Sequence, residues 1–287
     1  MSTLRIGTCS WKYDSWIGLI YKPDDKANYL KGYAGHYNTV EIDQWFWSLF
    51  PGKPPVLPKP ETVNQYVDAV PDDFEFSIKV PNSITLTHYY NRNKSAPLQA
   101  NPHFLSPDLF QQVLDRLSPM KDLLGPIMFQ FEYLNKVKMP SLELFLTKLA
   151  AFFEKCPRNY RYGLEIRNPQ YLNKTYFTFL REYQLGHVFL QGYYMPSIFN
   201  IFNQWSDWIR DWTVIRLHGP DRKGIESMTK GAWNTIVAAK DDELDQLHRM
   251  IEALLSKGVN ITLNVNNHYE GSSPLTIERI RDRLQSD

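Results

Sequence analysis

Pairs of polar residues separated by one apolar residue recur along this sequence, and their types are suited to chemistry. The pairs are Glu41/Asp43, Glu165/Arg167, Arg216/His218 and Asn264/Asn266. Residues two apart in a β-strand share one face, so each pair would point to one side and the apolar residue between its members to the other. Buried charges persist only when they are paired or serve a ligand. The pattern therefore indicates a buried ion-pair ring, a ligand site, or both in one place.

Acid–base catalysis is one chemistry that such a site could perform. Glu41 and Glu165 are candidate acid/base residues, because two carboxyl groups in different surroundings can have their pKa values pushed apart. Glycoside hydrolysis uses such a pair of carboxyl groups. His218 is the third candidate catalytic residue. The alternative role for Glu165 is an ion pair with Arg167 or Arg216, and the sequence leaves both roles open.

Binding of an anionic group is a second chemistry. Lys79, Arg167 and Arg216 could hold a phosphate or carboxylate, because a guanidinium group offers a bidentate fork and an ammonium group a point charge. The segment 219–224 follows the seventh expected strand, where barrels often hold phosphate, but it could equally be a solvated turn. Nearby aromatic residues would suit sugars or nucleobases. The residues predicted to bind the ligand are Trp11, Tyr13, Asp43, Lys79, Gln130, Arg167, Arg216, Asn266 and Asn267.

Other chemistries have weaker support. A divalent metal at His218, Glu41 and Glu165 is conceivable, but the neighbouring cations would compete for the carboxylates, so no cofactor or metal is predicted. Cys9 has no evident His partner and is interpreted as a small residue at a strand end. The S-x-x-K match at 227–230 is interpreted as chance, since that motif belongs to a different fold context.

Eight short β-rich runs would position these residues. They are expected at 4–9, 39–42, 74–79, 127–130, 162–166, 187–190, 213–217 and 260–265. Helical periodicity lies between most of them, at 107–117, 141–155, 175–183, 241–257 and 274–284. The helix at 141–155 has Ser141 as a plausible N-cap, and the helix at 241–257 ends at Gly258.

Strands alternating with helices eight times predict parallel strands that close into a single (β/α)8 barrel over residues 1–287. A doubly wound open sheet is the alternative. The polar pairs fall at the C-terminal strand ends, which is the reactive face of such barrels. The segments 48–60, 81–107 and 192–211 exceed normal connections and are expected to be binding loops, lids or tolerated insertions.

Composition limits the partners. The 287 residues carry a net charge of +1, so no global field attracts nucleic acid or a membrane surface. Two unpaired cysteines and the absence of a signal peptide or apolar span predict a cytoplasmic protein without membrane contact. A polar or anionic small molecule is the expected partner. The alternatives are non-catalytic binding of nucleotides or single-stranded nucleic acid, and assembly through the aromatic segment 193–212; the oligomeric state stays open.

Several short motifs in fixed order resemble the YecE-like family over about residues 5–284. They are GTCSWKY at 7–13, VEID at 40–43, QF at 130–131, EIR at 165–167, RLHG at 216–219 and NNHYEG at 266–271. The resemblance implies the same barrel and the same site, but no established reaction. Two residues depart from the family pattern, Asp43 for the usual Asn and Glu132 for the usual Pro. Both add negative charge near the expected site.

Overall fold

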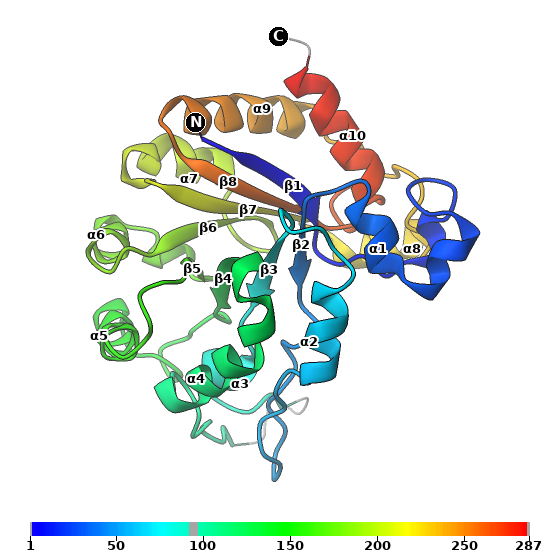
Figure 1. Ribbon diagram of the computed structural model, residues 1–287. Coiled ribbons are helices and arrows are strands. Elements are labelled where there is room, and N and C mark those ends of the chain that lie inside the picture. The colour runs from blue at the N-terminus through cyan, green and yellow to red at the C-terminus, as the bar shows by residue number, and fades with distance from the viewer. Residues whose placement is uncertain (1, 92–96, 286–287) are drawn as a thin grey trace.

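A computed structural model describes residues 2–91 and 97–285 of the chain, and its centre is a closed β-barrel. Eight parallel strands follow one another around the barrel in chain order, and β8 pairs with β1. Figure 1 shows the strands in the middle of the molecule with the helices around them. The strands are β1 (Leu4–Thr8), β2 (Thr39–Ile42), β3 (Glu75–Lys79), β4 (Leu124–Gln130), β5 (Tyr162–Glu165), β6 (Gly186–Gly192), β7 (Trp212–Gly219) and β8 (Asn260–Val265). The predicted barrel is therefore confirmed, and the open sheet is excluded.

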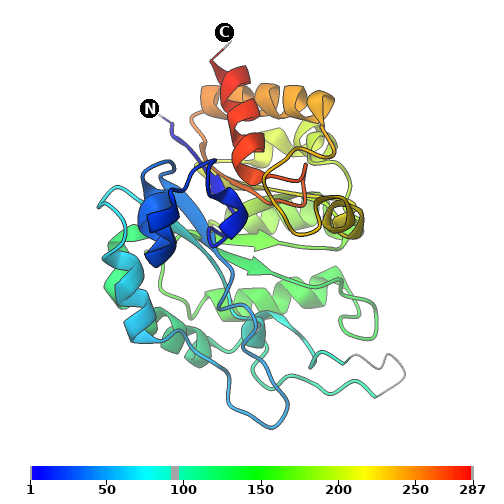
Figure 2. The same ribbon diagram turned by 90° about the vertical axis from the view of Figure 1, so that its right-hand side faces the viewer.

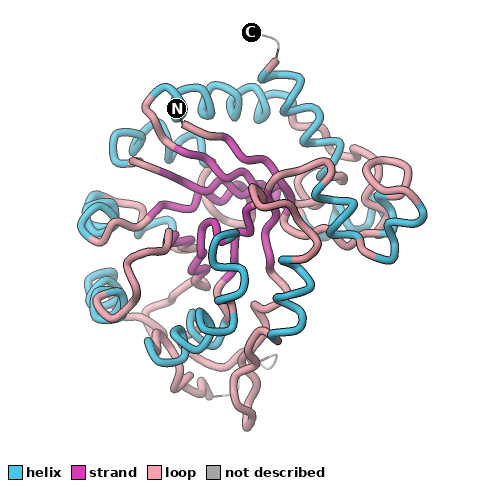
Figure 3. The backbone as a smooth tube through the Cα atoms, in the orientation of Figure 1, coloured by secondary structure: helices cyan, strands magenta, loops and turns pink. Residues whose placement is uncertain are grey.

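Helices connect successive strands along the outside of the barrel, as Figure 3 shows in cyan around the magenta strands. The α-helices are α1 (Tyr29–Ala34), α2 (Pro60–Val67), α3 (Asn82–Thr85), α4 (Pro107–Arg116), α5 (Leu142–Phe153), α6 (Lys174–Glu182), α7 (Ile198–Trp205), α8 (Arg222–Thr229), α9 (Asp241–Ser256) and α10 (Ser273–Leu284). Five 3-10 helices accompany them: η1 (Asp14–Trp16), η2 (Pro23–Ala27), η3 (Ser118–Leu123), η4 (Pro169–Tyr171) and η5 (Ser206–Trp208). No helix in the described part of the chain is long and apolar enough to cross a membrane.

The five predicted helices form at their expected places. Ser141 is the N-cap of α5, and its Oγ accepts a hydrogen bond from the Leu144 N–H at 3.2 Å. Helix α5 buries Phe145, Leu149 and Phe152 on one side, which is the stripe that its periodicity indicates. Lys174 begins α6 one residue earlier than predicted because Asn173 caps it.

The segment 192–211 is a correction, because a helix occupies the middle of this expected loop. Helix α7 buries Ile198, Phe199, Ile201 and Phe202, which belong to the main hydrophobic core. Tyr194 before the helix is fully exposed. The sequence analysis also missed α1, α2, α3 and α8, which have four to eight residues each and too few turns for a clear periodicity.

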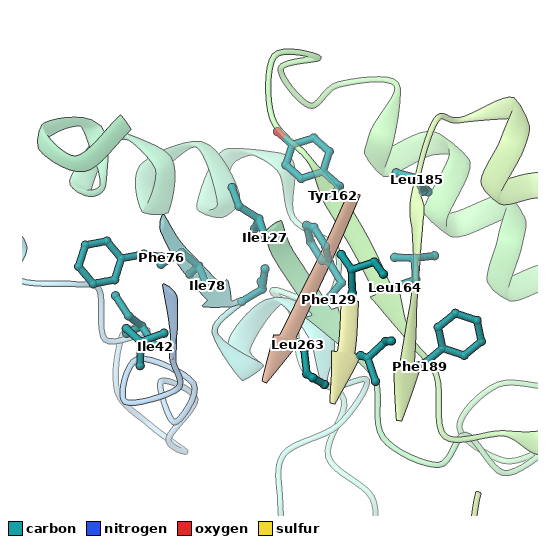
Figure 4. Close-up of a cluster of buried hydrophobic side chains, with 14 of the residues drawn as sticks. Ile42, Phe76, Ile78, Ile127, Phe129, Tyr162, Leu164, Leu185, Phe189 and Leu263 are labelled. Atoms are coloured by element: carbon teal, nitrogen blue, oxygen red, sulfur yellow. The ribbon is translucent and has the colours of Figure 1, made fainter. Parts of the chain in front are cut away.

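Apolar side chains from the outer face of the strands pack under the helices. Figure 4 shows part of this layer, with Phe129, Leu164 and Phe189 from neighbouring strands. The apolar members between the polar pairs, Ile42, Ile166, Leu217 and Val265, all belong to it. The predicted alternation of faces is therefore confirmed. Inside the barrel, the polar residues lie at the C-terminal strand ends, and a small apolar cluster of Met128, Val188 and Val214 lies below them.

Two glycines allow the chain to turn sharply over the C-terminal end of the barrel. Gly192 at the end of β6 has φ +133°, and Gly219 at the end of β7 has φ +75°. A Cβ atom on Gly192 would lie 2.3 Å from the Gly219 carbonyl oxygen. A Cβ atom on Gly219 would lie 2.6 Å from the His268 carbonyl oxygen, so each glycine allows a close approach to the loop that follows the next strand.

Candidate functional site

A guanidinium group lies at the centre of the barrel mouth and contacts residues from three other strands. Arg216 of β7 donates from Nε to Glu41 Oε2 at 2.8 Å and from Nη2 to Glu41 Oε1 at 2.6 Å. Its Nη1 donates to Glu165 Oε2 and, at 3.3 Å, to Gln130 Oε1. All four side chains are buried. The residues that sequence parity placed on one side therefore do meet, and their first contacts are with one another.

Arg167 is the second cation of the group, just beyond the end of β5. Its Nε and Nη2 both donate to Glu165 Oε1 at 3.2 Å, and its guanidinium carbon lies 4.5 Å from the Tyr193 ring centroid. Burial alone would raise the pKa of Glu165, but Arg216 and Arg167 outweigh it and hold this pKa below its usual value. Glu165 is therefore an ionised partner of two arginines, and the ion-pair alternative describes its contacts.

Lys79 is the third cation, at the end of β3. Its Nζ lies 4.1 Å from the centroid of the Phe46 ring, and the described residues give it no ion pair and no hydrogen bond. Burial, and then the charge of Arg216, lower the pKa of Lys79 despite the opposing effect of Glu41 and Glu165. The side chain is only half-buried. Its ammonium head is thus the least satisfied charge of the site.

His218 faces the same space from the end of β7. Its Nε2 lies 3.6 Å from Cys9 Sγ, and its Nδ1 lies 3.4 Å from the Tyr193 hydroxyl. Burial, followed by the charges of Arg216 and Lys79, holds the pKa of His218 well below its usual value. The imidazole is consequently neutral at physiological pH. His218 is thus a partner that the sequence did not indicate for Cys9, which corrects that part of the prediction. Burial also raises the pKa of Cys9 well above its usual value, which keeps it a thiol.

The departures from the family pattern have different surroundings. The Asp43 side chain is exposed at the rim, where desolvation and then the charge of Glu41 raise its pKa. Glu132 instead pairs with Lys138 and accepts a hydrogen bond from the Thr87 hydroxyl at 3.2 Å. Lys138 neutralises the added charge at Glu132, so Asp43 is the departure that matters for the site.

The two asparagines after β8 hold the chain in place. Asn267 Oδ1 accepts hydrogen bonds from the Ser273 N–H at 2.8 Å and the Ser273 hydroxyl at 2.9 Å, which fastens the start of α10. Asn266 Oδ1 accepts from the His268 N–H at 2.9 Å, and His268 Nε2 in turn lies 3.0 Å from Glu226 Oε1. The side chain of Asn267 is therefore buried and holds the start of α10, whereas the side chain of Asn266 is only half-buried.

Of the two aromatic residues predicted to bind the ligand, one is buried in packing contacts and the other lies near the rim. Trp11 is buried edge-on against Tyr66, with ring centroids 5.1 Å apart, and is a packing residue. Tyr13 packs on Trp16 at 4.6 Å, and burial raises its pKa to about 12, with the charge of Asp43 adding to the effect. Only Tyr13 therefore remains near the rim charges.

Sequence reasoning did not select Phe46 and Tyr193 as site residues. Their rings lie against Lys79 and Arg167 respectively, the two cations that are half-buried. Both aromatic residues come from loops after strands, so no strand periodicity marks them. The sequence feature that could have identified them is an aromatic residue within the few positions after the end of a strand.

The expected phosphate loop and the conceivable metal site find little support in the contacts. Residues 219–224 lead into α8, where Asp221 caps the helix by accepting from the Gly224 N–H at 2.9 Å. A carboxylate thus lies where an anion would bind. Within 2–91 and 97–285, no three His, Cys, Asp or Glu side chains form a metal-binding group. Arg216 and Arg167 occupy the oxygens of Glu41 and Glu165.

Fold and site together define a (β/α)8 barrel with a charged, ion-paired C-terminal mouth. The chain belongs to the family described as "Protein of unknown function DUF72", which it matches over residues 5–287. Among curated proteins it is similar to UPF0759 protein YecE of Escherichia coli, strains K12 and O157:H7, with 29% identity over 172 residues. These residues are 60% of this chain and 51% of the relative, so the match spans about half the length of YecE.

Solved structures show the same fold. A DUF72 family protein of Enterococcus faecalis V583 superposes with a TM-score of 0.69 at 18% identity, over 99% of this chain and 96% of that one. A DUF72 family protein of Thermotoga maritima MSB8 gives a TM-score of 0.66 at 18% identity, over 99% and 100%. The resemblance that the sequence motifs carry is thereby confirmed, and the family has no established reaction.

Proposed function

We propose that this barrel is an enzyme, a hydrolase or lyase that acts on a small anionic substrate, phosphorylated or sugar-like, at its C-terminal mouth. The balance of charge carries the proposal. Two buried carboxylates, Glu41 and Glu165, face three cations, Arg216, Arg167 and Lys79. These five side chains comprise one more cation than carboxylate, and Lys79 and Arg167 are the half-buried members of the set. The third carboxylate nearby, Asp43, is exposed at the rim and does not belong to the set. An anionic ligand would complete the balance.

The residues then take separate roles. Glu41 and Glu165 hold Arg216 as a rigid base under the site, so neither is a free proton carrier. Lys79 and Arg167 attract the anionic group. Asp43 has a raised pKa and His218 is neutral, so these two are the groups available to transfer a proton or to polarise a carbonyl.

Ligand-induced thermal stabilisation tests the proposal. Inorganic phosphate and glucose 6-phosphate should raise the melting temperature at concentrations where glucose does not. Arg167→Lys and Lys79→Met should each reduce this shift, measured against their own unliganded melting temperature. Lys257→Met is the matched control, because this exposed cation pairs with Asp207 Oδ1 at 2.9 Å just before β8 begins, at the end of the barrel opposite the mouth. Equal shifts in all variants, or no shift with any anion, would overturn the proposal.

Nucleotide or single-stranded nucleic-acid binding without chemistry is a second candidate, and one observation favours it. Trp47 and Tyr90 are 60% and 69% exposed and lie edge-to-face with centroids 6.3 Å apart. Exposed rings of this kind can stack on bases. The candidate predicts an affinity that falls steeply with salt, which a fluorescence-polarisation titration of a labelled oligonucleotide would measure. Absent or salt-independent binding contradicts it.

The compartment is also proposed. Cys9 and Cys156 are both free and buried, which supports a reducing environment such as the cytoplasm.

A further inference from the structure

We propose that Lys79 is a nucleophile that forms an imine with a substrate carbonyl, so that the substrates of this barrel are anionic aldehydes or ketones and the reaction is a lyase reaction. The inference deepens the proposed function and rests on it for the anion site. It assigns Arg167 to the anionic group and Lys79 to the carbon that reacts.

The guanidinium groups cannot act as nucleophiles, and their contacts fix them. Arg216 donates hydrogen bonds to Glu41, Glu165 and Gln130 at the centre of the barrel. Arg167 donates twice to Glu165 through Nε and Nη2 and stacks on Tyr193, and its Nη1 has no hydrogen bond to the described residues. These contacts hold an anion-binding head at one side of the site.

Lys79 differs from both arginines. Three carboxylates lie in its electrostatic neighbourhood, yet none of them forms an ion pair with it in the described chain. Arg216 and Arg167 have taken the oxygens of Glu41 and Glu165, while Asp43 lies out at the rim. The Nζ atom rests instead over the Phe46 ring at 4.1 Å.

This environment makes the Lys79 ammonium group easier to deprotonate than that of an ordinary exposed lysine, so the charged form binds the anion and a larger fraction than usual is the reactive amine. A lysine becomes a nucleophile when it is desolvated or placed beside another cation, because both disfavour its charged form. Lys79 has both conditions, burial and the neighbouring Arg216, and they lower its pKa. An ammonium group kept only to bind anions would keep its charge more securely beside a carboxylate partner.

The chemistry balances without an oxidant or reductant. The lone pair of the Lys79 amine bonds to the carbonyl carbon, and the C=O electron pair moves to oxygen. The two amine protons leave with that oxygen as water, and a C=N bond remains. Once protonated, the imine nitrogen accepts the electron pair of the C–C bond beyond the α-carbon as that bond breaks, while neutral His218 takes the proton of the hydroxyl on the departing carbon, which leaves as a carbonyl compound. The α-carbon then takes up a proton. Water later hydrolyses the imine and restores the amine.

Covalent trapping on the unmodified protein tests this directly. Pyridoxal 5′-phosphate carries an aldehyde and a phosphate on one small ring, and borohydride reduces its imine to a stable amine. Peptide mapping by mass spectrometry after brief labelling should find Lys79 modified at least tenfold faster than the exposed Lys12 and Lys223. Inorganic phosphate should slow the labelling of Lys79 and leave the exposed lysines unaffected.

Two comparisons separate this inference from the proposed function. Pyridoxal, which lacks the phosphate, should label Lys79 at least tenfold more slowly, and Arg167→Lys should lose most of the advantage of the phosphate. Labelling of Lys79 without any phosphate preference keeps the nucleophile and overturns the anion site. If phosphate stabilises the protein but Lys79 is labelled no faster than Lys223, the anion site stands and the assignment of Lys79 as a nucleophile is wrong. Lys223→Arg should leave the rate at Lys79 unchanged.

Discussion

Arg216 is a buried charge whose stabilising effect depends wholly on its partners. An arginine that is 1% exposed would be strongly disfavoured alone, but two carboxylates and an amide oxygen surround it. Removing one member of such a group leaves the others uncompensated in a low dielectric. Its energetic role therefore appears only when the group is broken.

Arg216→Met should lower the free energy of unfolding by about 3–5 kcal/mol, because Glu41 and Glu165 would remain buried without their common partner. Urea denaturation at neutral pH measures the change. The exposed Arg222, paired only with Glu226, is the control, and its replacement by Met should cost less than about 1 kcal/mol. Equal losses in the two variants would contradict the assigned role of Arg216.

His187 makes a separate, pH-dependent contribution on the outer side of the barrel. Its ring is buried among Tyr176, Phe177 and Phe189, and burial lowers its pKa to about 3. Between pH 3 and the unfolded-state pKa near 6.5, the unfolded chain binds this proton and the folded chain does not. Stability attributable to His187 is thus full above that upper pKa and falls as the pH drops toward 3.

His187→Phe should flatten this part of the pH dependence, with a slope smaller by up to about 1.4 kcal/mol per pH unit between pH 6 and pH 4. Urea unfolding at a series of pH values measures both slopes. His218 also has a lowered pKa and stays present in both proteins, so only the difference reports on His187. Parallel curves would contradict the prediction.

The loops after β6 and β7 shape the mouth through their glycines. Gly192 needs both a positive φ and space that a side chain would fill, whereas Gly52 has a positive φ but open surroundings. Gly192→Ala should therefore destabilise the protein by more than Gly52→Ala, which should cost about 1–2 kcal/mol from its φ alone. Thermal unfolding compares the two. A smaller loss at Gly192 would show that the loops can move apart.

Helix α7 explains why element prediction failed where it did. Its eight residues follow a segment that contains Gly192 and Pro196. A helix this short has too few turns to show a clear apolar period. The buried face of α7 becomes evident only against β6 and its neighbours. The longer helices α5 and α9 were predictable because several turns repeat the same apolar stripe.

The barrel as a whole separates stability from function along its axis. At the N-terminal end, the Trp212 ring packs on the buried Met128, Val188 and Val214, and a Cβ atom on Gly186 would lie 2.5 Å from this ring. Glu75 pairs with Arg5 and Arg161 at the same end of the strands. The mouth residues lie at the opposite, C-terminal ends of the strands. In Figure 2, the long loops drawn in blue and cyan at the bottom lie far from both chain termini at the top.

Trp212→Ala should open a cavity and lower the free energy of unfolding by about 3–5 kcal/mol while leaving phosphate-induced stabilisation unchanged. Urea unfolding gives the first quantity, and thermal shifts with and without phosphate give the second. Lys79→Met should show the reverse, with a reduced ligand shift and a smaller loss of stability. A ligand shift that vanishes in Trp212→Ala would couple the two ends of the barrel.

Much of this architecture follows from local information. Alternation between polar and apolar residues in Glu41–Ile42–Asp43 or Arg216–Leu217–His218 is a property of adjacent positions, so the strands, their faces and the shared mouth could be predicted from the sequence. Eight repeats of strand and helix then led to the closed barrel. The short helices could not be predicted, because their packing partners lie far away in the chain.

Which charge pairs with which is decided only in three dimensions. Glu165 precedes Arg167 by two residues and Arg216 by 51, yet it contacts both, and Glu41 contacts Arg216 across 175 positions. The sequence by itself determined the fold class and the set of polar residues, because both depend on periodicity along the chain. The tertiary structure decided that Glu41 and Glu165 are held by arginines while Lys79 is left without a carboxylate, because pairing depends on distances between strands.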